Sequence, residues 1–81
     1  MAMNKEFKWA VKTLLDLCNI PANPGNLQAF ENPGANSQWI HAVIKRGMPQ
    51  VGAMNSSVYD KIINILEANG VPVNPYLPGN G

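Results

Sequence analysis

Apolar residues recur at steps of three and four along most of the chain, which is the spacing of amphipathic helices. The first apolar stripe, in a helix predicted over about 4–18, consists of Phe7, Ala10, Val11, Leu14, Leu15 and Cys18. This helix is expected to stop before Pro21, because the residue that precedes a proline avoids helical backbone angles. A second, shorter helix is predicted over 24–31, with Asn23 as its cap and Pro24 at its first position.

A third helix is predicted over 37–46, after a cap at Asn36, with an inward stripe of Trp39, Ile40, Val43 and Ile44. Gly47 and Pro49 come next, and a glycine with a proline close behind it is typical of a helix end. We therefore expect a loop over 48–54, with a weak signal for a hairpin edge at Val51-Gly52-Ala53.

A fourth helix is predicted over 56–68, where Ser57 and Asp60 have the spacing of a capping box. Asn69-Gly70 is a stop signal, and the tail over 71–81 holds three prolines and two glycines. This tail is expected to be extended and partly mobile. The fold class is therefore all-α, with four short helices in a single domain that covers 1–81.

Composition excludes several classes of protein. The chain is 46% hydrophobic and 14% charged, which is too apolar for a disordered protein. Cys18 is the only cysteine, so no intrachain disulfide is possible, and a reducing, cytoplasmic setting is the default. The polar N-terminus does not resemble a signal peptide, and no apolar run is long enough to predict a membrane span.

Catalytic chemistry is not indicated. His41 has no carboxylate or thiol at a usable spacing, and Cys18 belongs to an apolar stripe that predicts a buried thiol. No phosphate-binding loop, dinucleotide-binding turn or metal-ligand spacing occurs. We therefore expect no catalytic residue, no metal and no cofactor.

The outward side of the third helix has a distinctive composition. It carries only hydrogen-bonding or basic residues, namely Ser37, Gln38, His41, Lys45 and Arg46. Such side chains can read base edges and hold phosphates, whereas the alternative is an ordinary solvated helix face. The net charge of +1 is small, but the cations gather on the first helix and at the end of the third.

The order of elements resembles the helix-turn-helix DNA-binding domains of bacteriophage repressors and Cro proteins. The resemblance rests on a short helix over 23–31, a turn over 32–35, a third helix over 37–47, and the helix exit Lys45-Arg46-Gly47-Met48-Pro49. It implies a transcriptional regulator of phage or mobile-element type whose third helix enters the major groove of double-stranded DNA. Ser37, Gln38 and His41 would then face bases, and Lys45, Arg46 and Asn36 would hold phosphates.

So few cations would give a monomer weak affinity for DNA, so a homodimer is expected. The apolar residues of the tail are the candidates for its interface, namely Val71, Val73, Tyr76 and Leu77. The alternative is that they fold back over the core of their own chain.

Two other functions fit the sequence. Trp9 lies off the apolar stripe of the first helix, where it either covers the edge of the core or belongs to an interface. The second reading predicts a small protein-binding inhibitor or antirepressor that acts on a host or phage protein. A winged-helix excisionase or DNA-packaging component is the third possibility, with a wing that begins over 48–54.

Overall fold

The structure is a computed structural model that describes residues 3–77 of the chain. Its elements, in chain order, are Lys5–Leu17 (α1), Pro24–Glu31 (α2), Ser37–Met54 (α3), Ser56–Ala68 (α4) and the 3-10 helix Asn74–Tyr76 (η1). No strand occurs among the described residues. The all-α prediction is therefore confirmed.

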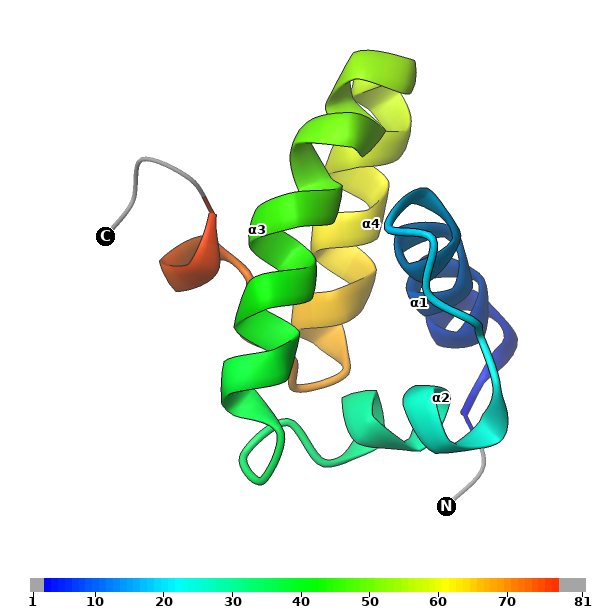
Figure 1. The fold of residues 1–81 in the computed structure, drawn as a ribbon. Coiled ribbons are helices and arrows are strands. Elements are labelled where there is room, and N and C mark those ends of the chain that lie inside the picture. Colours follow the sequence, from blue (N-terminus) through cyan, green and yellow to red (C-terminus); the bar gives the residue numbers. More distant parts are fainter. Residues whose placement is uncertain (1–2, 78–81) are drawn as a thin grey trace.

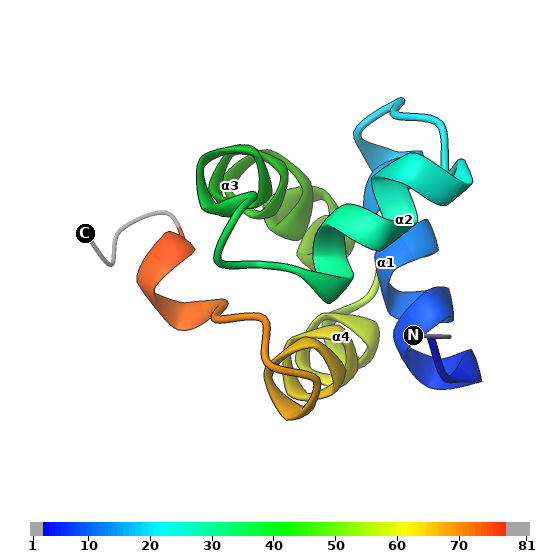
Figure 2. The same cartoon turned by 90° about the horizontal axis from the view of Figure 1, so that it is seen from below.

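Three of the helices form a bundle. α1, α3 and α4 all pack against one another, and α2 packs against α1 (Figure 1). Seen from below, the three helices mark the corners of a triangle, and η1 lies on the outer side of α3 (Figure 2). Each helix therefore contributes one side to the core and leaves another side for the surface.

Asparagine caps fix the beginning of the first two helices. The Oδ1 atom of Asn4 accepts a hydrogen bond of 2.8 Å from the backbone N–H of Phe7. Asn23 does the same for Asn26, also at 2.8 Å. Each bond satisfies a backbone donor that has no partner inside the helix. α2 has the predicted bounds, and α1 matches the prediction to within one residue at each end.

The ends of α1 and α4 share one geometry. Asn19 and Gly70 both have left-handed backbone angles, with φ of 58° and 86°. The next N–H then turns back to the last turn of its helix, so that Ile20 bonds the carbonyl of Leu15 and Val71 that of Leu66, both at 2.9 Å. This is the usual way for a chain to leave a helix and satisfy its last carbonyls.

α3 is longer than the sequence predicted. It continues to Met54, so the prediction of a helix end at Arg46 and a loop over 48–54 is wrong. The hairpin edge and the wing expected there are helical as well. Met48 and Val51 extend the buried stripe by another turn, and their burial favours continuing the helix. Pro49 lies on the exposed side, where solvent can reach the carbonyl that loses its partner.

Gly47 lies in the contact between α1 and α3. A Cβ atom at this position would lie 2.8 Å from the Sγ atom of Cys18 and would also collide with Leu14. The thiol of Cys18 points at the same segment and donates to the carbonyl of Val43 at 3.6 Å. Gly47 is therefore a contact residue rather than the helix cap that its sequence context suggested.

The start of α4 also differs in detail. Asn55 caps it, accepting bonds from the N–H groups of Ser57 at 2.9 Å and Val58 at 3.3 Å. Ser57 therefore lies inside the first turn, and the predicted capping box with Asp60 is wrong. The same residue ends α3, because its own N–H bonds the carbonyl of Val51 at 2.9 Å. Asn55 thus joins two helices with a single-residue turn.

The described part of the tail packs on the core instead of extending into solvent. Val71 and Val73 are fully buried beside residues of the helical bundle, and Tyr76 and Leu77 pack against the same core. The expectation of an extended tail is therefore wrong for 71–77, while 78–81 lies outside the described residues. Burial of two valines stabilises the fold by about 3–5 kcal/mol, so this segment is part of the domain.

Candidate nucleic-acid interface

The outward side of α3 presents the side chains that the sequence singled out. Gln38, His41, Lys45 and Arg46 are all exposed, and α3 contains no acidic residue. Neither Lys45 nor Arg46 forms an ion pair with another described residue. Ala42 is exposed on the same side and was missed by the sequence analysis, although it lies one turn after Gln38. The structure therefore brings together a polar strip with two unpaired cations.

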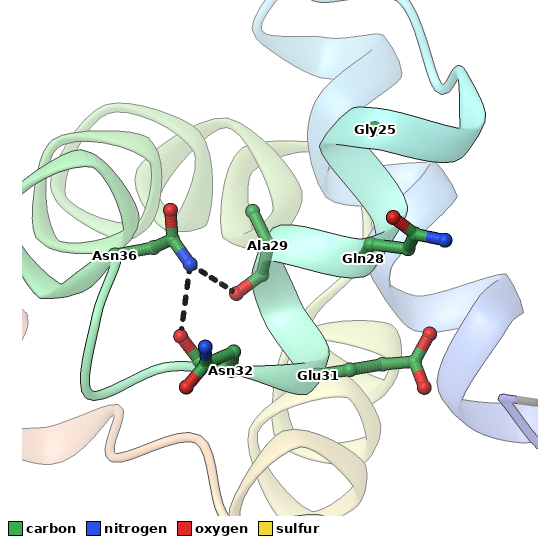
Figure 3. Close-up of a pocket in the computed structure, with 6 residues that line it drawn as sticks. All are labelled: Gly25, Gln28, Ala29, Glu31, Asn32 and Asn36. Carbon is green, nitrogen blue, oxygen red and sulfur yellow. Dashed lines mark hydrogen bonds between the residues drawn. The ribbon is translucent and has the colours of Figure 1, made fainter. Parts of the chain in front are cut away.

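The side chain of Asn36 does not cap α3, although the sequence predicted that it would. Its Nδ2 group instead donates to the carbonyls of Asn32 at 2.9 Å and Ala29 at 3.4 Å, which closes the turn between α2 and α3 (Figure 3). Both amide hydrogens are then in use, so the amide has none left for a phosphate. Its neighbour Ser37 is half-buried.

A hollow of about 440 Å³ lies beside this turn (Figure 3). The residues that line it are Gly25, Gln28, Ala29, Glu31, Asn32 and Asn36. These residues belong to α2, the turn and the cap of α3, whereas the exposed cations of α3 lie farther along the helix, at Lys45 and Arg46.

η1 forms one border of the polar strip. The imidazole of His41 stacks on the ring of Tyr76, with centroids 4.7 Å apart and ring planes at 20°. One face of the imidazole is therefore covered, although the residue as a whole is exposed. No sequence pattern could have joined these two residues, because the contact depends on the path of the tail.

The residues predicted for interfaces lie in different places, both the tail residues predicted for a homodimer and Trp9, which was predicted for an interface with a protein partner. Val73 is 0% exposed, so it contacts only its own chain. Tyr76 and Leu77 are half-buried against the same core and keep part of their surface accessible. Trp9 is 39% exposed and lies on α1, away from the tail. The four residues thus do not form one continuous surface.

All the cations on α1 are exposed. Lys5, Lys8 and Lys12 are all exposed, and Lys12 forms an ion pair of 2.8 Å with Asp16 one turn later. This exposed pair contributes little stability, but it offsets one of the three positive charges. The unpaired positive charge of α1 is therefore at Lys5 and Lys8.

The thiol of Cys18 is unsuited to chemistry at neutral pH. Burial raises the pKa of Cys18, and the nearby Arg46 guanidinium opposes that shift in part. The thiol form is not nucleophilic. Residues 3–77 contain no group of three or more His, Cys, Asp or Glu side chains that could hold a metal ion. In the same range, no helix is both long enough and apolar enough to cross a bilayer.

Comparisons with protein-family models, with curated proteins and with solved structures find no match to this chain. The residues of α3 and of the surfaces around it are therefore the features that indicate function.

Proposed function

We propose that this protein binds double-stranded DNA through the outward side of α3 and acts as a transcriptional regulator of phage or mobile-element type. The observation that carries the proposal is the exposed strip of Gln38, Lys45 and Arg46 on a helix without acidic residues. Amide and basic side chains on a groove-sized helix are the groups that read bases and hold phosphates.

The dimensions of α3 suit this role. Its 18 residues make a helix about 27 Å long, and a helix with side chains is about 10–12 Å across. The major groove is about 12 Å wide. Lys45 lies almost two turns after Gln38 on nearly the same line of the helix, and Arg46 points about 100° away from Lys45. The two cations can therefore reach phosphates farther along the groove while Gln38 and Ala42 face the base edges.

The number of contacts sets the oligomeric state that we propose. Two unpaired cations on α3 give a single copy few phosphate contacts, and phosphate contacts supply much of the affinity of such proteins. Two copies double that number, with half-sites about 34 Å apart along the duplex. The accessible parts of Tyr76 and Leu77 are the proposed contacts between the copies.

The first test is a fluorescence-anisotropy titration of a labelled random-sequence duplex at low and at physiological salt. We expect binding at low salt that weakens steeply as salt rises. The double variant Lys45→Ala/Arg46→Ala should lower the slope of log affinity against log salt by about two for each bound copy, one for each lost phosphate contact, and so by about four for the proposed dimer. Lys8→Ala removes an exposed cation from α1 and is the matched control that should leave binding unchanged.

Two results would contradict the proposal. One is no binding at low salt, and the other is an equal loss of affinity in Lys8→Ala and in the α3 variant.

Selection from random duplexes tests sequence specificity and the dimer together. A symmetric motif with half-sites one helical turn apart is expected, and Gln38→Ala should relax the preference at one position in each half.

A further inference from the structure

A second surface stands out on the side of the bundle away from α3. Trp9 of α1 is 39% exposed, which is unusual for so large an apolar side chain. Beside it lies a depression of about 250 Å³, lined by Lys5, Glu6, Trp9, Lys61 and Ile65. Because α1, α3 and α4 pack as a triangle, the groove between α1 and α4 faces away from α3 (Figure 2).

The size of the depression indicates what it can hold. Sites for free small molecules usually measure about 300–1,000 Å³, so this one is below that range. It is large enough for one apolar side chain, which would contact Trp9 and Ile65, the two apolar residues of the lining. Such a side chain would belong to a partner protein, like the anchor residues that fill pockets at protein interfaces.

The charges around the depression indicate which residues should flank that side chain in the partner. The Nζ atom of Lys61 lies 5.0 Å from the centroid of the Trp9 ring, and Lys5 lines the same depression. Neither lysine forms an ion pair with another described residue, and Glu6 is the one acid among the lining residues. The indole N–H of Trp9 is a further donor with no hydrogen-bond partner among 3–77. Two cations and a donor around an apolar seat are complementary to carboxylates.

The same charges disfavour a second copy of this chain. The lining holds two lysines and one glutamate, so a two-fold symmetric contact would place one net positive surface against another, which is costly. Nucleic acid is disfavoured as well, because the Lys61 ammonium lies over the indole ring where a base would stack.

From these observations we infer that the Trp9–Lys61 groove binds a short acidic segment of a partner protein, with one apolar side chain seated against Trp9 and flanking Asp or Glu side chains on Lys5 and Lys61. The groove faces away from α3, so the segment and DNA can be bound at the same time. The inference does not depend on the proposed DNA binding.

A peptide titration followed by two-dimensional ¹H–¹⁵N NMR tests the inference. The probes are seven-residue peptides with a central Leu, Ile, Met, Phe or Trp between Asp and Glu residues. At least one should give saturable shifts of the Trp9 indole signal and of the Lys5 and Lys61 amides. The signal is assigned by its loss in Trp9→Phe, which separates it from the indole of Trp39. Replacing the central residue by Ser, or the acids by Asn and Gln, should abolish the shifts.

The double variant Lys5→Ala/Lys61→Ala should bind the best peptide about fivefold more weakly, since exposed charge pairs each contribute modestly. Lys45→Ala/Arg46→Ala is the matched control and should bind it as the unaltered protein does. It also separates this surface from DNA binding, which that control should weaken.

Four results would overturn the inference. They are no saturable shift with any of the five peptides, shifts centred on α3, shifts that depend on protein concentration alone, and equal shifts with a thymidine oligonucleotide or with anionic phosphatidylserine vesicles.

Discussion

The ring of Tyr76 in η1 stacks on the imidazole of His41 in α3, with centroids 4.7 Å apart. The contact fastens the described end of the tail to the helix that carries the proposed DNA-binding strip. Val73, fully buried a few residues earlier, anchors the same segment from the core side. Tail and helix therefore form one unit, and a regulator that binds DNA through α3 would bring the tail to the edge of the groove.

A double-mutant cycle measures this contact. Tyr76→Ala and His41→Ala should each lower the free energy of unfolding, and the two losses should not add. We expect a coupling energy of about 0.5–1.5 kcal/mol, which is typical of packed aromatic pairs. Chemical denaturation of the four proteins gives the value. A cycle of Tyr76→Ala with Lys45→Ala is the control, and a coupling as large there would show that the stack is not its source.

Gly47 provides a second test, of the contact between α1 and α3. Alanine favours a helix interior over glycine by about 1 kcal/mol, but overpacking costs about 1–3 kcal/mol. Because a Cβ would lie only 2.8 Å from the Cys18 Sγ atom and would also meet Leu14, the second effect should win. Gly47→Ala should therefore lower the stability measured by thermal or urea unfolding.

Gly52 is the matched control in the same helix. Its Cβ would lie 3.2 Å from the Cδ2 atom of Tyr59, a contact that a small shift of the ring relieves. Gly52→Ala should therefore be neutral or stabilising by up to about 1 kcal/mol. A Gly47→Ala protein as stable as Gly52→Ala would show that the two helices can separate without cost.

Short sequence signals correctly predicted two helix boundaries. Asn23 with Pro24 predicts a helix start, and α2 begins at Pro24. Asn69 with Gly70 predicts a helix stop, and α4 ends at Ala68. Gly47 has the same local appearance as a helix end, yet it lies in the middle of α3. The apolar spacing of Met48 and Val51 continues the stripe of α3 past Gly47, and their burial favours the helix over the end that Gly47 and Pro49 suggest.

The candidate site was also predictable only in part: the exposed residues of α3 could be predicted, but the contacts around them could not. Exposure of Gln38, Lys45 and Arg46 follows from helix periodicity, and the structure places all three on the outside. Asn36 could not be foreseen as the residue that closes the turn, because its partners are backbone carbonyls at the end of α2. The cover that Tyr76 gives to His41 depends on the path of the tail after α4, which no periodicity describes.

Asn55 gives a third prediction, because one side chain caps α4 at the turn between two helices. Asn55→Ala removes the acceptor for the N–H groups of Ser57 and Val58, and should cost about 1 kcal/mol of stability. Ser57→Ala is the control, since Ser57 makes no side-chain cap bond in the described structure and its loss should change stability by less than about 0.5 kcal/mol. A larger loss of stability for Ser57→Ala than for Asn55→Ala would show that Ser57, with Asp60, caps α4 after all.

The last prediction concerns the pH dependence of stability that Cys18 creates. Burial raises the pKa of this thiol in the folded protein above its ordinary value near 9.0. In the unfolded chain the thiol ionises at lower pH than in the fold, so the unfolded state is favoured once the pH passes that ordinary value. The stabilising contribution is fully present below about pH 9.0 and is lost as the pH rises toward the folded pKa.

Urea unfolding from pH 7 to 10.5 should therefore show a steeper decline for the unaltered protein than for Cys18→Ala, by at most about 1.4 kcal/mol per pH unit. The comparison of slopes cancels the titration of lysines and tyrosines, which both proteins share. Arg46→Gln removes the charge that opposes the shift, so it should raise the pKa of Cys18 further and extend the decline to higher pH. Parallel curves for the unaltered protein and Cys18→Ala would show that the thiol titrates alike in both states.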